Sequence, residues 1–258
     1  MRIATWNVNS LKVRLSRVEE WLSYAKPDVL CMQETKLADA AFPHLAFEAL
    51  GYEVAHHGGG RWNGVAICSR VGIDEVVNGF AHGLDADRDT RLVTARCAGV
   101  SVTSVYVPNG RSLEDEHYRY KLTWLATLEE HLSAVASPDQ PVAVCGDFNV
   151  APEGRDVWDE SKFVGTTHTS EPERQALAKL EKWGLHDAFR ERYPDDGLYT
   201  YWDYRAGDFH QHRGMRIDLL LLSAPLANAV EWALVDRNAR KGKLPSDHAP
   251  LFVDVDFP

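Results

Sequence analysis

The sequence predicts an α/β protein in which two mixed β-sheets pack face to face, with helices on their outer surfaces. Short, nearly continuous apolar runs recur along the chain, which is typical of strands covered on both faces. These runs outnumber the amphipathic segments, and several follow one another without a helix between them. A regular alternation of strands and helices is therefore disfavoured, and two packed sheets are favoured.

Nine segments have the composition of strands. The five clearest are Arg2–Val8, Asp28–Glu34, Ser101–Val107, Val142–Phe148 and Ile217–Leu222. Four weaker candidates are Gly64–Cys68, Leu92–Cys97, Val230–Val235 and Leu251–Val255. Gly99, after Ala98, predicts a tight hairpin between two of these strands.

Three segments have apolar residues three or four positions apart, as amphipathic helices do. The first follows Ser10, a candidate N-cap, and is closed by Pro27. The second covers residues 122–135. The third begins at Ser170, which with Glu173 predicts a capping box. We expect each helix to direct its apolar side to the core.

The composition is that of a globular protein of 258 residues. No linker, repeat or change of composition divides the chain, so we expect a single domain over residues 1–258. The four cysteines lie in apolar runs without paired spacing, which predicts buried thiols in a reducing compartment. Because no apolar run approaches the roughly 20 residues of a membrane span and no leader precedes the first strand, we expect an intracellular protein without a membrane partner.

The formal net charge of -10 at pH 7 argues against a general binder of polyanions. Contacts with phosphates normally require clustered lysines and arginines. Any function on nucleic acids must therefore rest on local basic patches and on a bound metal.

Polar residues stand at the ends of the predicted strands, where they can converge on one rim without being buried unpaired. Any one of them is explained by a turn or a helix cap. Together, a set of amides, carboxylates and one histidine without cysteine is typical of a magnesium site, because Mg²⁺ prefers oxygen ligands. The amides, carboxylates and histidine are Asn7, Glu34, Asp147, Asn149, Asp218, Asp247 and His248, and Tyr106 lies near the end of one of the same strands.

Six motifs resemble those of exonuclease III and related abasic-site endonucleases, in the same order and over essentially the whole chain. Two of them, Asp-x-Asn and Ser-Asp-His, are shared with the wider superfamily of DNase I and inositol polyphosphate phosphatases, whereas the combination is specific. The motifs are Trp6-Asn7-Val8-Asn9, Gln33-Glu34-Thr35-Lys36, Tyr106-Val107-Pro108-Asn109-Gly110, Gly146-Asp147-Phe148-Asn149-Val150-Ala151-Pro152, Arg216-Ile217-Asp218 and Ser246-Asp247-His248-Ala249-Pro250.

The resemblance implies a four-layer α/β sandwich with the active site at one edge, and Mg²⁺ as cofactor, with Mn²⁺ able to substitute. Glu34 would be the main metal carboxylate. The full set of implied metal residues is Asn7, Glu34, Asp147, Asn149, Asp247 and His248.

The resemblance also implies catalytic roles. His248, oriented by Asp218, would contact the scissile phosphate or help to activate water. Asp147 would position or deprotonate that water, or protonate the leaving 3′ oxygen. Tyr106, Asn149 and Asn109 would donate hydrogen bonds to phosphoryl oxygens. The sequence does not decide between His248 and Asp147 as the base.

The implied substrate is double-stranded DNA with abasic sites or blocked 3′ ends, cut by a monomer of the bacterial, cytoplasmic type that acts on the nucleoid. Incision 5′ to the abasic site, 3′–5′ exonuclease and 3′-phosphodiesterase or phosphatase activity are expected. Trp62 would lie against the minor groove. A pocket for the base-free sugar would be lined by Tyr201, Met215 and Ile217, with Trp202 at its edge. Backbone phosphates would be bound by Arg216, Arg240 and Lys241.

Two other readings stay open. A phosphatase or phospholipid esterase of the superfamily would share Asp147, Asn149, Asp247 and His248 but lack the Tyr106–Gly110 and Arg216–Asp218 motifs. A catalytically dead nucleic-acid-binding relative would have lost acidic metal ligands, which this chain retains.

Overall fold

The computed structural model describes residues 1–81 and 89–257, in which the strands form two six-stranded mixed sheets. The first sheet contains β1 (Arg2–Asn7), β2 (Val29–Gln33), β3 (Glu53–His57), β4 (Val65–Ser69), β11 (Val230–Val235) and β12 (Leu251–Val255), in the order β11-β12-β1-β2-β4-β3. The second contains β5 (Asp74–Asn78), β6 (Leu92–Cys97), β7 (Val100–Tyr106), β8 (Val142–Asp147), β9 (Leu185–Asp187) and β10 (Asp218–Ser223), in the order β5-β6-β7-β8-β10-β9.

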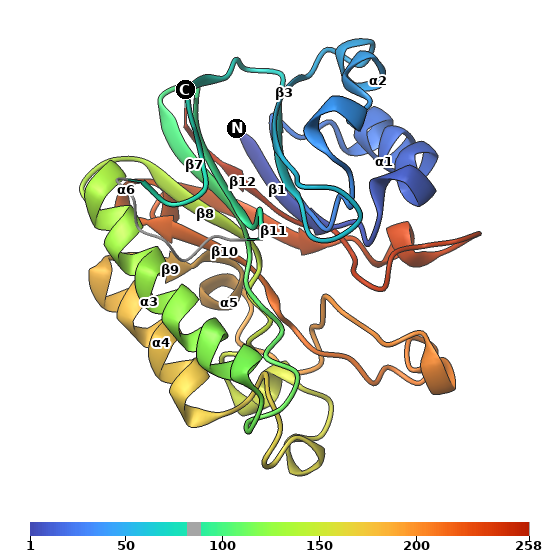
Figure 1. Ribbon diagram of the computed structural model, residues 1–258, viewed down its shortest axis with the longest axis vertical. Helices are drawn as coiled ribbons and strands as arrows, with labels where there is room; N and C mark the ends of the chain where they lie inside the picture. The colour runs from blue at the N-terminus through green and yellow to red at the C-terminus, as the bar shows by residue number, and fades with distance from the viewer. Residues whose placement is uncertain (82–88, 258) are drawn as a thin grey trace.

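Helices cover the outer face of each sheet, as Figure 1 shows. The first sheet carries α1 (Leu11–Ala25) and α2 (His44–Glu48), and the second carries α3 (Glu116–Val135) and α4 (Glu171–Trp183). Shorter helices are α5 (Ala188–Arg192), α6 (Ala224–Ala227) and the 3₁₀ turns η1 (Asp39–Ala41), η3 (Gly154–Asp156), η4 (Glu160–Lys162), η5 (Arg205–Gly207) and η6 (Arg237–Arg240). The predicted fold class, a four-layer α/β sandwich, is confirmed.

Three apolar cores hold the layers together. Between the sheets, side chains such as Cys31, Val102 and Leu220 are fully buried. The other face of the first sheet packs with α1 through residues that include Trp21, and the other face of the second packs with α3 through residues that include Trp124. Because each strand is covered on both sides, its sequence is a continuous apolar run.

The nine predicted strands are present, and three short strands were not predicted. These are β3, β5 and β9. The hairpin is confirmed, since Ala98 and Gly99 have φ angles of 45° and 83° and Cys97 pairs with Val100. The capping box of Ser170 and Glu173 is also confirmed.

Ser10 stands at the N-cap position of α1, as predicted, but it does not cap the helix with its side chain. Its φ angle is 85°, and its side chain makes no capping hydrogen bond. Instead, the backbone N–H groups of Ser10 and Leu11 donate to the carbonyl oxygens of Glu34 and Thr35, at 2.7 and 3.0 Å. The start of α1 is therefore fastened to the segment that carries Glu34.

The four cysteines are free and buried, as predicted. They lie in strands of both sheets. Within residues 1–81 and 89–257, no helix has the length and apolar character that a membrane crossing requires.

Candidate active site

The predicted catalytic residues stand at the ends of strands, and the register of the second sheet brings three of them side by side. Asp147 ends β8, where it pairs with Tyr106 of β7 and Asp218 of β10. In the first sheet, Asn7 ends β1 beside the end of β2, which Glu34 follows directly. The two sheets therefore present acids and amides to each other at one edge.

The amide of Asn7 joins the two sheets at this edge. Its Nδ2 donates to Oε1 of Glu34 at 2.9 Å and to Oδ2 of Asp147 at 2.8 Å. Its Oδ1 accepts from the backbone N–H of Asn9 at 3.0 Å, which fixes the orientation of the amide. Lys36 Nζ binds Oε2 of Glu34 at 2.7 Å. Burial raises the pKa of Glu34, but the Lys36 ammonium outweighs burial and holds it below its usual value.

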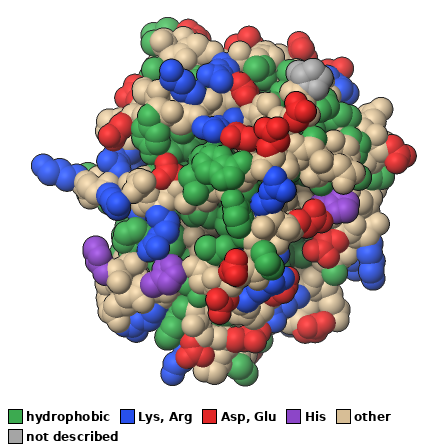
Figure 2. Space-filling view, turned by 180° about the vertical axis from the view of Figure 1, so that it is seen from behind, with side chains coloured by type: hydrophobic (Ala, Val, Ile, Leu, Met, Phe, Trp, Pro, Cys, Tyr) green, Lys and Arg blue, Asp and Glu red, His purple; other side chains and the backbone are tan. Residues whose placement is uncertain are grey.

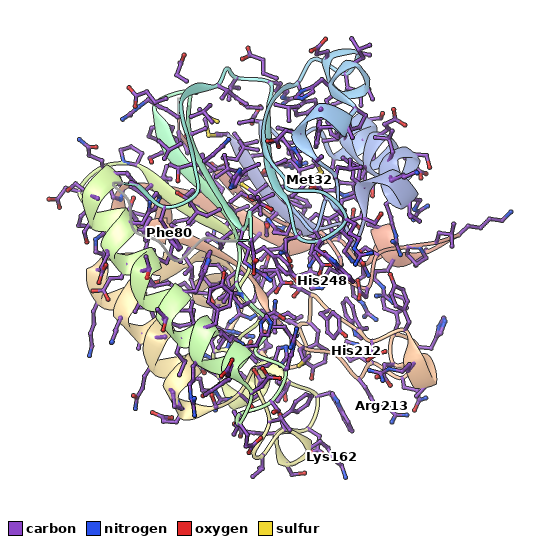
Figure 3. All side chains as sticks on the ribbon, viewed as in Figure 1. Met32, Phe80, Lys162, His212, Arg213 and His248 are labelled. Carbon is purple, nitrogen blue, oxygen red and sulfur yellow. The ribbon has the colours of Figure 1, made fainter. Side chains whose placement is uncertain are left out.

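His248 and Asp218 form a buried dyad, in which Nδ1 of His248 lies 2.8 Å from Oδ2 of Asp218. Nε2 of the same ring lies 3.8 Å from Oδ2 of Asp147. Burial alone lowers the pKa of His248, but the carboxylates of Asp218 and Asp147 outweigh it and raise the pKa to about 10. Burial also raises the pKa of Asp147, to about 7. The imidazole is therefore a cation at neutral pH, and Asp147 titrates near neutrality. Figure 3 shows His248 between the strands and the loop that carries His212 and Arg213.

The donor set fits a hard divalent cation. Glu34 and Asp147 supply carboxylate oxygens on either side of one amide, and Asp247 adds a third acid, which accepts from Nδ2 of Asn9 at 3.1 Å. Asp147, Asp218 and His248 also present ligand atoms within 4.8 Å of one another. Of the predicted metal residues, the three acids are grouped around the amides of Asn7 and Asn9, whereas Nδ1 of His248 is engaged by Asp218.

Tyr106 lies beside these acids. The guanidinium of Arg91 stacks on its ring at 4.6 Å, and Nη1 of Arg91 donates to its backbone oxygen. Burial, with the charges of Glu34 and Asp147, raises the pKa of Tyr106 well above its usual value. The phenol keeps its proton and can serve as a hydrogen-bond donor.

An apolar cluster adjoins the histidine. Tyr201 and Met215 are partly buried and pack with Ile217. The ring of Tyr201 packs on the ring of His248, with centroids 4.9 Å apart. The three residues predicted to line a sugar pocket therefore form one cluster beside His248.

Three residues predicted to contact DNA are exposed. Trp62 has 64% of its surface accessible and stacks with Arg61 at 5.2 Å. Lys241 and Asn109 are also exposed. These side chains are free to meet a ligand.

Three others are buried. Arg216 is fully buried, with its guanidinium bound to Asp156 and Asp187. Trp202 is fully buried against Phe209. Arg240 is 7% exposed, stacks on Phe209 at 4.7 Å and donates to the carbonyl of Trp202. The predicted phosphate contact of Arg216 is wrong, because the carboxylates of Asp156 and Asp187 already bind its guanidinium donors.

Residues without a role in the sequence analysis also belong to the site. Lys36 and Asn9 occur in the recognised motifs, so the motifs could have signalled them. Lys121 and His168 carried no signal. Lys121 is fully buried and binds the carbonyl oxygens of Asn109 and Asn149.

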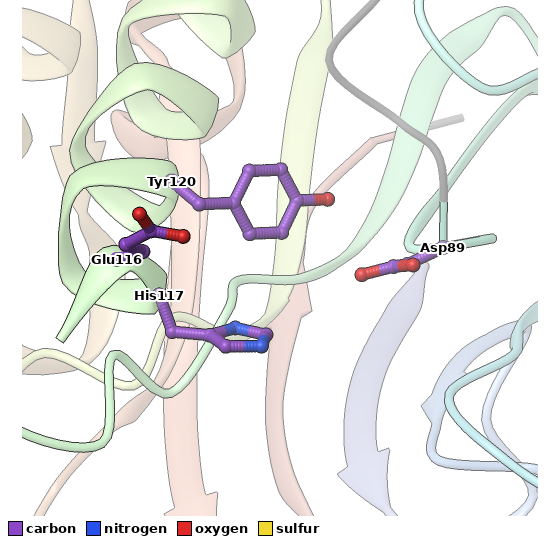
Figure 4. A pocket seen from close by; sticks show the side chains of 4 residues that line it. All are labelled: Asp89, Glu116, His117 and Tyr120. Atoms are coloured by element: carbon purple, nitrogen blue, oxygen red, sulfur yellow. The ribbon is translucent and has the colours of Figure 1, made fainter.

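Outside the site, a cavity of about 340 Å³ is lined by Asp89, Glu116, His117 and Tyr120, at the start of α3 (Figure 4). It contains none of the predicted catalytic residues. On the face seen in Figure 2, acidic and basic side chains are interspersed without an extended basic patch. That distribution agrees with the acidic composition of the chain.

This fold and this site define a class of hydrolase, a two-sheet α/β sandwich with a His–Asp dyad and clustered acids at one edge. The chain belongs to the Endonuclease/Exonuclease/phosphatase family, whose sequence model matches residues 4–248.

Similar proteins span its whole length. Exodeoxyribonuclease III of Haemophilus influenzae is 30% identical over 98% of this chain and 99% of that protein. An AP endonuclease from Archaeoglobus fulgidus superposes with a TM-score of 0.96 at 38% identity, covering 100% of both chains. A 3′ phosphatase from Neisseria, solved with a product DNA hairpin, superposes with a TM-score of 0.95 at 37% identity, also over 100% of both chains.

Proposed function

We propose that this protein is a magnesium-dependent DNA-repair phosphodiesterase that incises DNA 5′ to abasic sites and also removes nucleotides or phosphates from 3′ ends. The observation that carries the proposal is the junction of the two sheets, where Asn7 holds Glu34 beside Asp147 and Asp147 faces His248. The similarity to an AP endonuclease and to a 3′ phosphatase bound to DNA supports the substrate class.

Hydrolysis of a phosphodiester needs an oriented water, neutralisation of charge and relief of charge on the leaving oxygen. Glu34 and Asp147 would hold Mg²⁺, with Asp247 nearby, and the bound ion would supply charge neutralisation. Asp147 accepts from the amide of Asn7 and faces Nε2 of His248, so its carboxylate is placed to orient the attacking water or to exchange a proton with it. His248, a cation bound to Asp218, is suited to bind the phosphate rather than to act as base.

Hydrogen-bond donors complete the site. Tyr106 keeps its proton, and the exposed amide of Asn109 is open to a phosphoryl oxygen. The cluster of Tyr201, Met215 and Ile217 would hold the base-free sugar beside His248.

The test is cleavage of a duplex oligonucleotide that holds one abasic-site analogue, beside an undamaged duplex, with Mg²⁺, with Mn²⁺ and with EDTA. Metal-dependent incision on the 5′ side of the lesion, leaving a 3′ hydroxyl, supports the proposal. A parallel assay offers phosphoinositide as substrate. Cleavage of phosphoinositide and of neither duplex would favour the alternative of a superfamily phosphatase or phospholipid esterase. Binding of DNA without any cleavage would favour the alternative of a catalytically dead protein that regulates by binding nucleic acid.

We further propose that residues 1–258 act as one catalytic domain, as a cytoplasmic monomer. The core between the sheets, which both halves of the chain build, supports one domain. Light scattering after size-exclusion chromatography measures the oligomeric state. A mass near 29.0 kDa supports the monomer, and twice that mass contradicts it.

A further inference from the structure

His168 lies between the two asparagines that face the proposed phosphate site. Its Nε2 is 3.2 Å from Oδ1 of Asn149 and 3.1 Å from Nδ2 of Asn109. Nδ2 of Asn109 also donates to Oδ1 of Asn149, at 3.3 Å. The three side chains therefore form a closed set of contacts, in which the two asparagines lie just beyond the ends of β7 and β8.

The surrounding structure fixes the backbone of both asparagines. Nζ of Lys121 donates to the carbonyl oxygens of Asn149, at 2.6 Å, and of Asn109, at 3.2 Å. Nδ2 of Asn149 donates to the carbonyl oxygen of Val107 at 2.9 Å. This last bond orients the amide so that Oδ1 of Asn149 faces His168. The amide cannot flip without losing that bond, so an oxygen acceptor stays next to the ring.

The fold holds His168 itself in an unusual conformation. Its φ angle is 81°, a left-handed conformation that is uncommon for a residue other than glycine. Its N–H donates to Oε1 of Glu173 at 2.9 Å, and its carbonyl accepts from Ala151 at 2.7 Å. The capping-box acid of α4 thus presents the ring to the two asparagines.

The number of N–H groups of Asn109 that remain for a substrate depends on whether Nε2 of His168 carries a proton. If Nε2 of His168 is unprotonated, it accepts one N–H of Asn109 while Asn149 accepts the other, and Asn109 has none left for a substrate. If Nε2 is protonated, it donates to Asn149, and Asn109 keeps one N–H. Because Asn109 is exposed, that N–H can reach a phosphoryl oxygen.

We propose that His168 is a positioning residue, which donates its Nε2–H to Oδ1 of Asn149 and thereby leaves one N–H of Asn109 free for the substrate phosphate. The inference rests on the proposed function and adds a residue to it. His168 touches no reacting atom and acts through the two amides.

The test compares His168→Leu with His168→Gln. Both substitutions keep a long side chain and face the same backbone strain, but only Gln retains an N–H donor. We expect His168→Leu to lower kcat for incision of the abasic duplex roughly tenfold, with KM changed less than about twofold, because the amides act as charge develops on the phosphoryl group. His168→Gln should recover most of kcat. The matched control is His186→Leu, since His186 pairs with Glu191 in an exposed position outside the site and should leave kcat unchanged.

Thermal unfolding and NMR separate this role from a structural one. Unchanged kcat in folded His168→Leu overturns the proposal, as do equal losses of kcat and of melting temperature in the Leu and Gln variants. Long-range ¹H–¹⁵N NMR of the wild-type ring must show a protonated Nε2, and an unprotonated Nε2 overturns the assignment. If the wild-type protein cleaves no abasic duplex, the proposed function fails, while the NMR result still tests the hydrogen bond.

Discussion

Arg216 stabilises the fold rather than binding DNA, and its replacement by methionine tests this difference. Nε of Arg216 lies 2.6 Å from Oδ1 of Asp156, and Nη1 lies 2.6 Å from Oδ2 of Asp187. The guanidinium of Arg190 binds the same oxygen of Asp156. Methionine matches much of the length of arginine and removes only the charge and the donors.

The expected loss in the free energy of unfolding of Arg216→Met follows from the burial of the ion pair. Arg216 and Asp156 have no accessible side-chain surface, and removal of one partner of a buried ion pair costs about 3–5 kcal/mol. Since Arg190 still binds Asp156, we expect the lower end, about 3 kcal/mol. At about 2–4 °C per kcal/mol for a protein of this size, the melting temperature should fall by roughly 6–12 °C.

The loss of stability in Arg216→Met should also depend on pH. Burial raises the pKa of Asp156, but Arg216 and Arg190 outweigh it and hold the pKa below its usual value. The stability from this carboxylate is therefore present above the unfolded pKa of about 3.9 and is lost as pH falls through the folded pKa. The difference in melting temperature between wild type and Arg216→Met should shrink in strong acid.

The assay is thermal unfolding followed by circular dichroism, near neutral pH and in acid, with DNA affinity measured well below the transition. Arg155→Met is the control, because Arg155 pairs with Glu153 at the surface and should change the melting temperature little. An unchanged melting temperature of Arg216→Met, together with weaker DNA binding, would refute the structural assignment and restore the phosphate contact.

Three more predictions concern the site. Asp218→Asn should lower the pKa of His248 from about 10 and reduce the stability that the histidine gives below about pH 6.5 and loses as pH rises through 10, with Asp147 still supplying part of it; NMR and melting of the metal-free protein measure both, and an unshifted titration would contradict it. Glu34→Gln should weaken Mg²⁺ binding roughly 10- to 100-fold in calorimetry, and unchanged affinity would remove Glu34 from the metal site. Asp147→Asn should abolish incision and leave DNA affinity nearly intact, whereas equal losses in both would oppose its chemical role.

The strands that build the core could be predicted because burial on both faces leaves a continuous apolar run. Val142–Asp147 contains such a run, and all its residues are buried. The strand Asp74–Asn78 lies at a sheet edge with mostly exposed side chains, so its sequence has no apolar face to detect. Leu185–Asp187 is too short for any periodicity.

The site was predictable where function requires a polar residue at the end of an apolar strand. Asp147 and Asp218 have this signature, and the register places them side by side. The surroundings of an arginine have no such signature. The residues next to Arg216 in the sequence do not reveal whether its side chain faces solvent or the interior. Its partner Asp156 is 60 residues away in the chain. His168 likewise meets Asn149 only through tertiary structure.

The acidic composition and the proposed substrate are compatible because of where the charges lie. Several cations are used inside the protein, among them Lys121 on Glu173 and Arg216 on Asp156, so fewer remain for phosphates than the sequence count implies. The cations at the proposed site are also paired with acids, Lys36 with Glu34 and His248 with Asp218. A bound Mg²⁺ would therefore supply much of the positive charge that a phosphate meets there. Selection among phosphodiesters therefore depends on fit at the site more than on general affinity for the polyanion.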